Sequence, residues 1–404
     1  MFFDNVKKGA PDIMYHLKVQ ADGDKSPDKV DLGVGIYRNE QGLYNEMKVL
    51  KQAKAALAAA NPDHDYEVTT GNQSYLENAA KVVFGKDSSL LQANQVASVQ
   101  TISGTGAVHI AFMLLARSVP GMSKTVYVGT PAWGNYVPML GLAGLDAKTY
   151  THYDPKTGTV AWDSVLATVR SAPEGSIFVL QACCHNPTAA DFTKEQWQIL
   201  AQEMKTRRQF PVFDIAYQGL GNGLEEDIYC VRHFVEQGFE MLVCQSFAKN
   251  FALYGERVGA LHAVCPSADS ALAVRDQMRF LIRVEFSSSP AYGSRLVDLI
   301  LSDPAREAAW RQELDGVHQR LHKLRAKLFD LLTNAYKTPG DWSVITKGNG
   351  LFTLLPLTVA QCETLQKKYH IYLVTTGRVT VSGLNERNID YVAKSIDTVV
   401  RESQ

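Results

Sequence analysis

Short apolar runs alternate with longer amphipathic segments between residues 95 and 265. The runs have the length and the β-branched content of buried strands, and most are followed by a segment with helical periodicity. This alternation predicts βαβ units, and therefore an α/β fold with a mostly parallel sheet flanked by helices. The predicted strands are Val96–Ile102, Val126–Gly129, Ile177–Ala182, Pro211–Phe213, Met241–Gln245 and Val258–Val264, and the predicted helices include Ala107–Arg117, Thr193–Arg207 and Glu225–Gln237.

The pattern changes near residue 305, where a long helical periodicity covers Ala305–Asn334. A shorter mixture of strand and helix patterns follows and predicts a second, smaller α+β domain hinged on that helix. Its predicted elements are strands at Gly350–Leu355, Ile371–Val374 and Val379–Val381, a helix at Ala360–Tyr369 and a last helix from Glu386. The pattern alone does not place the first forty-odd residues.

The composition indicates an intracellular globular protein. The 404 residues include 41 basic and 42 acidic side chains, so the net charge of −1 gives no reason to expect nucleic acid or a membrane surface as partner. No apolar run is long enough to span a bilayer, and the N-terminus lacks the pattern of a secretory signal. The six cysteines form no CxxC pair, which favours buried thiols over disulfides or a zinc site. We therefore expect a soluble, cytoplasmic location.

The segment with the most chemical information begins at Ser246 and contains Lys249 and Arg257. A lysine just past a buried strand is placed to be desolvated, which lowers its pKa and lets the free amine form a Schiff base with a carbonyl. Ser246 and Arg257 on the same loop are suited to a phosphate. A solvated lysine with a surface ion pair is the alternative for this segment taken alone.

Other segments with suitable chemistry also end predicted strands. Ser103-Gly104-Thr105 stands between a strand and a helix, where backbone N–H groups and hydroxyls can bind phosphate. Asp214 ends an apolar strand, where a carboxylate needs a cationic or hydrogen-bonding partner, and Tyr217 follows it. Two further residues that could contact a planar ligand are the amide Asn186 and the indole Trp133, although Trp133 fits a core position equally well.

In their order along the chain and in their residues, these segments resemble the class I pyridoxal-phosphate aminotransferases, closest to the aspartate aminotransferases. The resemblance runs from Val30-Asp-Leu-Gly-Val-Gly35 to Gly377-Arg378-Val-Thr-Val-Ser-Gly383 and covers nearly the whole chain. It implies the type I fold of pyridoxal-phosphate enzymes, with a large domain at 46–304 and a small domain made of 1–45 and 305–404. It also implies ping-pong transamination between aspartate or glutamate and the oxo acids 2-oxoglutarate and oxaloacetate, with pyridoxal 5′-phosphate as cofactor.

The resemblance assigns roles to the matching residues. Lys249 would bind the cofactor covalently and act as general acid and base, and Asp214 would hold the ring nitrogen protonated. Tyr217 and Asn186 would bind the phenolic oxygen of the ring, and Trp133 would stack on it. The residues implied for the phosphate are Ser103, Gly104, Thr105, Ser246, Arg257 and, from the neighbouring subunit, Tyr66.

A dicarboxylic substrate is implied by two arginines of the matched motifs. Arg378 would bind the α-carboxylate and Arg283 of the other subunit would bind the distal carboxylate, since a guanidinium pairs with a carboxylate through two hydrogen bonds. Gly35 would lie against the substrate, where a side chain would intrude. The resemblance thus implies a homodimer with shared active sites and no metal.

Four positions depart from the family pattern. Gln181 and Tyr136 stand where many members have histidine near the ring-binding aspartate, Ala189 where glycine is usual and Ser288 where asparagine is usual. These changes put the rate and fine specificity in doubt more than the reaction class. A tyrosine can still donate a hydrogen bond to Asp214, so we expect tuning of the site.

Several alternatives remain to be compared with the structure. An aromatic or broad-specificity aminotransferase is the nearest, and a β-lyase or another enzyme of the same cofactor is more distant; Arg378 argues against decarboxylation because it would hold the carboxylate in place. Ser246-x-x-Lys249 also matches the serine–lysine hydrolases, but Lys156-Thr157-Gly158 precedes it and no Ser-Asp-Asn exists. His318 and His322 lie one helical turn apart, where a polar helix face is favoured over a metal site.

Overall fold

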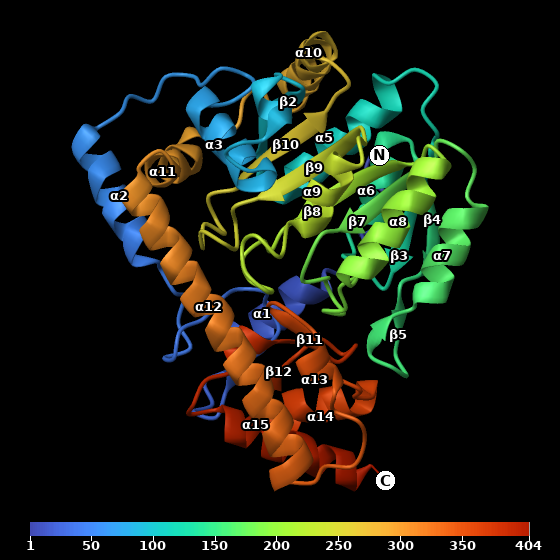
Figure 1. Cartoon of the computed structure of the whole chain (residues 1–404). Coiled ribbons are helices and arrows are strands. Elements are labelled where there is room, and N and C mark those ends of the chain that lie inside the picture. Colours follow the sequence, from blue (N-terminus) through green and yellow to red (C-terminus); the bar gives the residue numbers. More distant parts are fainter. Residues whose placement is uncertain (404) are drawn as a thin grey trace.

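The computed structural model describes residues 1–403 and is built around one seven-stranded sheet with the order β2-β10-β9-β8-β7-β3-β4 (Figure 1). The strands are β2 Val96–Ile102, β3 Thr125–Thr130, β4 Asp146–Thr151, β7 Ile177–Gln181, β8 Phe210–Ile215, β9 Met241–Ser246 and β10 Val258–Val264. β10 runs antiparallel to both of its neighbours, and the pairs from β9 to β4 are parallel. The predicted mostly parallel sheet and its six strands are confirmed; β4 was not predicted, because it is a polar edge strand with a single buried residue, Tyr150.

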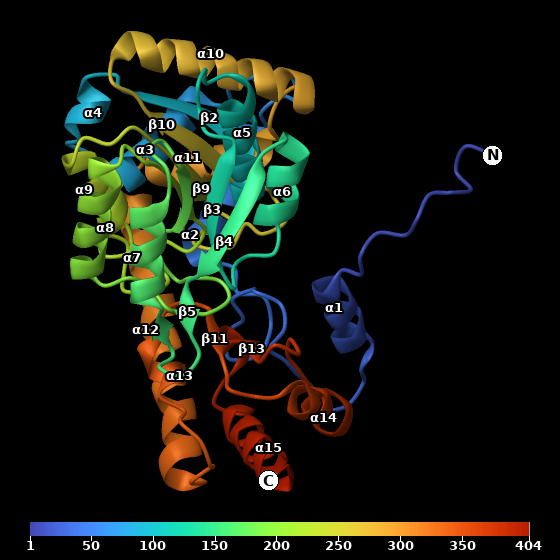
Figure 2. The same cartoon turned by 90° about the vertical axis from the view of Figure 1, so that its right-hand side faces the viewer.

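Helices cover both faces of the sheet (Figures 1 and 2). Successive residues of β9 point to opposite faces, so Leu242 joins one core cluster and Val243 the other. The first cluster includes residues of α5 Ser103–Arg117, α6 Tyr136–Ala143 and α10 Ala268–Glu285, and the second includes residues of α3 Gln73–Phe84, α7 Trp162–Ser171, α8 Lys194–Thr206 and α9 Tyr229–Glu236. Such a sheet places its functional residues at the carboxyl ends of its parallel strands.

The long helix α12, Pro304–Asp330, leads from the sheet to the C-terminal part of the chain and ends in a π-helical turn, Leu331–Ala335 (Figure 1). Its first turn is capped by Asp303, whose carboxylate accepts from two backbone N–H groups. Trp310 is fully buried, stacks on Phe251 with 4.5 Å between ring centroids, and donates through Nε1 to the carbonyl of Asn250. The helix is therefore anchored to the loop that carries Lys249.

The C-terminal part brings together segments that are far apart in the sequence. β1 Val30–Asp31 pairs in parallel with β12 Ile371–Tyr372, so the early residues that the pattern left unplaced lie beside the last third of the chain.

The remaining elements of the whole chain are α1 Ile13–Gly23, α2 Lys48–Ala60, α4 Ser89–Gln92, β5 Tyr153–Asp154, β6 Thr159–Val160, α11 Ala291–Leu301, α13 Val344–Lys347, β11 Phe352–Leu354, α14 Val359–Tyr369, β13 Arg378–Thr380, a short 3₁₀ turn Val381–Gly383 and α15 Ile389–Glu402.

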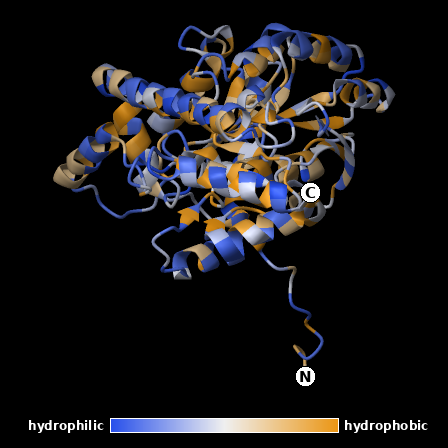
Figure 3. Cartoon of the chain, turned by 90° about the horizontal axis from the view of Figure 1, so that it is seen from below, coloured by the Kyte–Doolittle hydropathy of each residue, from blue (hydrophilic) through white to orange (hydrophobic). Residues whose placement is uncertain are grey.

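The first ten residues project away from the rest of the chain (Figures 2 and 3). Phe2 and Phe3 on this arm are exposed, in contrast to the buried aromatic residues of the sheet. Within residues 1–403, none of the helices has both the length and the apolar character that crossing a membrane requires.

Candidate active site

A cavity lies at the carboxyl ends of β7, β8 and β9, against the start of α5. Ten residues singled out in the sequence line it, together with Gln181 and Ala216. The ten are Ser103, Gly104, Thr105, Trp133, Asn186, Asp214, Tyr217, Ser246, Lys249 and Arg257. The structure thus brings together side chains from segments that the sequence separates by more than 150 residues.

Lys249 lies in the turn that follows β9, with Nζ 5.0 Å from the centre of the Tyr217 ring. Burial lowers the pKa of this lysine, an effect opposed by the charge of Asp214 and reinforced by Arg257. Among residues 1–403, no group accepts a hydrogen bond from Nζ. The direction of this pKa shift favours the free amine, which is the form that reacts with a carbonyl.

Asp214 is buried at the end of β8, and its Oδ2 accepts a hydrogen bond of 2.5 Å from the hydroxyl of Tyr136. Burial raises the pKa of this carboxyl, whereas the Tyr136 hydrogen bond and Lys249 lower it. Its other oxygen, Oδ1, has no hydrogen-bond donor among residues 1–403. A buried carboxylate with one free oxygen on a cavity suits a ligand that presents a cationic N–H.

The opposite end of the cavity is suited to an anion. Ser103 begins α5, and its hydroxyl lies 3.2 Å from that of Ser246. A Cβ on Gly104 would come within 3.0 Å of the Ser246 Cβ, so glycine keeps this approach open. Arg257 is anchored by Nη1 to the carbonyl of Tyr254, and burial lowers its pKa. Two hydroxyls, a guanidinium and a helix N-terminus form an anion-binding group.

Arg378 is held beside the cavity by contacts with the N-terminal segment and with the turn that follows β7. Nη2 donates to the carbonyl of Gly33 at 2.9 Å, and Nη1 donates to Asn186 Oδ1 at 3.3 Å. The guanidinium lies 4.6 Å above the Phe352 ring, and Nε is buried without a partner in the part of the chain that the structure describes. A Cβ on Gly35 would lie 2.7 Å from Phe352, so glycine there leaves space for this ring.

Four predicted site residues do not line the cavity: Gly35 and Arg378, described above, and two residues at the surface, Tyr66 and Arg283. Tyr66 is 89% exposed, and Arg283 near the end of α10 donates through Nη1 to the Ser287 hydroxyl at 2.6 Å. Ser288 follows on the same turn. Within one chain these side chains do not meet Arg378, and their role at the site of a neighbouring subunit stays a prediction.

Sequence reasoning noted Gln181 but did not identify its contact. Its amide donates to the carbonyl of Asn186 and accepts from the N–H of the same residue. The signal was a polar side chain at the end of an apolar strand. Phe352 below Arg378 gave no signal, since an aromatic residue in a short strand is typical of a core.

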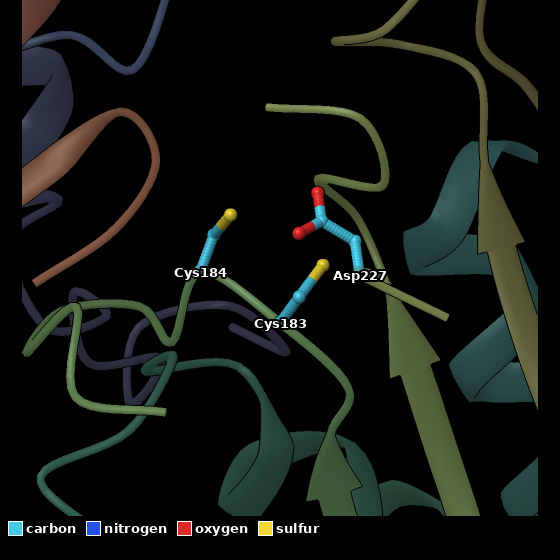
Figure 4. A group of neighbouring side chains, drawn as sticks. All are labelled: Cys183, Cys184 and Asp227. Carbon is cyan, nitrogen blue, oxygen red and sulfur yellow. The ribbon is translucent and has the colours of Figure 1, made fainter. Parts of the chain in front are cut away.

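A group of buried side chains close to the cavity, Cys183, Cys184 and Asp227, has ligand atoms within 4.8 Å of one another (Figure 4). The Asp227 carboxylate accepts from the backbone N–H groups of Gly219, Gly221 and Asn222. Burial raises the pKa of the Cys184 thiol to about 12, so it stays protonated. We interpret Cys183, Cys184 and Asp227 as a structural group, in which the Asp227 carboxylate stabilises the loop that follows β8. All six cysteines are free and buried, as predicted.

The same loop contacts α12. His318 Nδ1 and His322 Nε2 lie 2.6 Å and 2.8 Å from the carbonyl oxygen of Gly221. Both imidazoles are therefore engaged in hydrogen bonds that join the long helix to the sheet. This arrangement agrees with the polar helix face that the sequence favoured.

The family model for class I and II aminotransferases matches residues 27–396. The chain therefore belongs to this family, and its resemblance to it is confirmed.

Among curated relatives, the aminotransferase tasG of Hapsidospora irregularis is 47% identical over 99% of this chain and 97% of its own length. Others, 37 to 40% identical, include cytoplasmic and mitochondrial aspartate aminotransferases.

Among solved structures, the aspartate aminotransferase from Saccharomyces cerevisiae cytoplasm has a TM-score of 0.95, 37% identity and coverage of 100% and 99% of the two chains. The aromatic-amino-acid aminotransferase of Burkholderia pseudomallei, described as covalently bound to pyridoxal phosphate, has a TM-score of 0.95 and 36% identity, and covers 99% of this chain and 100% of its own.

Proposed function

We propose that the protein is a pyridoxal-phosphate-dependent aminotransferase that acts on aspartate, glutamate and the corresponding 2-oxo acids. The observation that carries this proposal is the cavity in which a half-buried lysine faces a buried carboxylate, Lys249 Nζ and Asp214 Oδ1 having no hydrogen-bond partner within residues 1–403. Membership of the aminotransferase family supports the reaction class, and the cofactor found in the Burkholderia relative supports pyridoxal phosphate.

The residues of the cavity fit this cofactor. Asp214 would hold the protonated ring nitrogen, Lys249 would attach the cofactor, and Tyr217 and Asn186 would contact its phenolic oxygen. Trp133 would stack on the ring. The phosphate would be held by Ser103, Gly104, Thr105, Ser246 and Arg257. When bound, pyridoxal phosphate supplies a carbonyl that accepts the amino group and a protonated ring that draws electrons from the substrate α-carbon.

The chain's own groups then bind the substrate and move a proton. Arg378 binds the α-carboxylate, and the ring of Phe352 together with the hydrogen bonds to Gly33 and Asn186 fixes the plane of the guanidinium. Lys249 Nζ takes a proton from the α-carbon as general base and returns one as general acid, which its lowered pKa permits. Because Arg378 holds the carboxylate, loss of the α-proton is favoured over decarboxylation.

Selection of a second carboxylate is assigned to Arg283 of a neighbouring subunit, with Tyr66 of that subunit on the cofactor phosphate. The exposure of both side chains in the single chain supports this homodimer. We further propose that residues 46–304 form the large domain and that 1–45 and 305–404 form the small one, a division supported by the pairing of β1 with β12. The cytoplasmic location stays a prediction, since relatives come from more than one compartment.

A second candidate is an aromatic or broad-specificity aminotransferase. It is favoured by the structural similarity to the Burkholderia enzyme, which is as high as that to the yeast aspartate enzyme. Absorption spectra of the half-reaction with aspartate and with phenylalanine separate the two. We expect aspartate to convert the bound cofactor to its aminated form at far lower concentration than phenylalanine does.

The attachment site is tested by borohydride reduction of the holoenzyme and peptide mass mapping. We expect the pyridoxyl group on the peptide that contains Lys249. A label on another lysine, or none in a preparation that contains the cofactor, would overturn the proposal.

A further inference from the structure

Gln181 is the last residue of the buried strand β7, and its side-chain amide forms two hydrogen bonds with the main chain of one cavity residue. It ends β7, where the strand register places it beside Asp214 of β8. Its Nε2 donates to the carbonyl oxygen of Asn186 at 3.1 Å, and its Oε1 accepts from the N–H of Asn186 at 2.9 Å. Both polar groups of the Asn186 main chain are thus fixed by a single side chain.

Asn186 in turn contacts the substrate-binding arginine. Its Oδ1 accepts from Arg378 Nη1, and the residue lines the cavity while only 8% exposed. The preceding part of the turn is held separately, because the Asp191 carboxylate accepts from the N–H groups of Cys184 and His185. Gln181 therefore holds the turn after β7 at Asn186, the residue that lines the cavity and contacts Arg378.

We propose that Gln181 is a positioning residue for the substrate α-carboxylate, acting through Asn186 to orient Arg378. The inference rests on the proposed function for the identity of the ligand, and on the three hydrogen bonds that link Gln181, Asn186 and Arg378 for its geometry. A guanidinium binds a carboxylate well only in a fixed plane, since two parallel N–H groups must meet two oxygens. Without the two hydrogen bonds from Gln181, Asn186 can rotate away from Arg378. The guanidinium then loses the contact with Asn186 Oδ1 that helps to fix its plane.

The test replaces Gln181 by methionine, which keeps the length of the side chain and removes both hydrogen bonds. Calorimetry with the holoenzyme and succinate, a dicarboxylate without an amino group, measures binding apart from turnover. We expect binding about 10-fold weaker than in the wild type, because a hydrogen bond that orients a charged group is worth roughly one to two decades in affinity. The KM for aspartate should rise by a similar factor while kcat changes much less.

Gln209 offers a matched control. It is a buried glutamine just before β8, at the opposite end of the sheet, and its Nε2 donates to the carbonyl of Val169 at 2.8 Å. Q209M should therefore lower the melting temperature as Q181M does, and leave succinate binding at the wild-type value.

A double-mutant cycle tests the route through Asn186. In the N186A background, Q181M should lose most of its effect on succinate binding, because alanine keeps the main chain that Gln181 holds but removes the side-chain oxygen that accepts from Arg378. Full additivity of the two changes, or unaltered succinate binding in Q181M, overturns the proposal. Failure of the wild-type holoenzyme to bind succinate at all would count instead against the proposed substrate class.

Discussion

The two halves of the proposed site differ in whether a single chain encloses them. Lys249 and Asp214 line the cavity at the carboxyl ends of the strands, where burial lowers the pKa of the lysine and raises that of the aspartate. Tyr66 and Arg283 lie on the surface, and Arg283 donates a hydrogen bond to the hydroxyl of the neighbouring Ser287. In the proposed function, Lys249 and Asp214 would carry the chemistry, Arg283 would select the substrate and Tyr66 would contact the cofactor phosphate.

This contrast has a physical reason. Desolvation and a neighbouring cation lower the pKa of a lysine, and both act on Lys249 within a single chain. An exposed guanidinium is surrounded by water, which weakens its attraction for a carboxylate, so it discriminates poorly until another surface excludes that water. We infer that the inner half of the site, which contains Lys249 and Asp214, is complete in one chain. The outer half, which contains Tyr66 and Arg283, depends on a second copy of the chain.

Replacement of Lys249 by alanine is expected to have the largest effect. Without the amine no group is positioned to move the α-proton, so kcat for aspartate should fall by about 10⁴-fold or more. Single-turnover absorption after addition of aspartate measures this step. Lys194 is a matched control, since its Nζ also lies over an aromatic ring, Tyr229, but at the surface. K194A should keep wild-type turnover, and a K249A enzyme with more than about 1% of that turnover would contradict the assigned role.

Replacement of Arg283 by leucine should have the next largest effect. The kcat/KM for aspartate should fall by about 10²- to 10⁴-fold, because the distal carboxylate loses its partner, while phenylalanine should be used as well or better. Steady-state kinetics with both amino acids measure the change. Equal use of aspartate by R283L and the wild type would remove the basis for dicarboxylate selection.

The same variant tests whether the site is shared. K249A and R283L subunits are each inactive on aspartate as homodimers, but a hybrid contains one site with both an intact lysine and an intact arginine. Random exchange of equal amounts should therefore restore about one quarter of wild-type activity. Activity that stays at the level of the separate variants would place Arg283 in its own subunit's site or outside any site.

The same contrast decides what could be predicted from the sequence. The buried half leaves a strong signal, because strand patterns end at Asp214 and just before Lys249, and the fold brings strand ends together. β4 was missed because its exposed, polar sequence lacks the periodicity of a buried strand. The contact between Gln181 and Asn186 was missed because it depends on the backbone path of a turn, which side-chain patterns do not specify.

Loss of the Tyr136 hydroxyl should have a moderate effect on the inner half. Y136F leaves Asp214 Oδ2 without its donor in a buried site, so the pKa of Asp214, already raised by burial, rises further. A larger fraction of Asp214 is then neutral, and the acid limb of the kcat profile should move to higher pH, with kcat at neutral pH about 10-fold lower. Tyr75 is a matched control, since its buried hydroxyl has no partner within residues 1–403. Y75F should leave the pH profile in place, and an unshifted profile in Y136F would mean that the hydroxyl does not support the charge of Asp214.

Replacement of Ser287 by alanine should have the smallest effect, and it acts on the outer half. The Ser287 hydroxyl accepts from Arg283 in the free chain, so the arginine must give up this hydrogen bond before it can bind a substrate carboxylate. Because an exposed hydrogen bond contributes little, the KM for aspartate should fall by only about 2- to 3-fold in S287A, with kcat unchanged. S270A, near the other end of α10, should leave KM unaltered. A higher KM in S287A would show instead that the serine presents the arginine to the substrate, and the outer half would then be partly organised within the single chain.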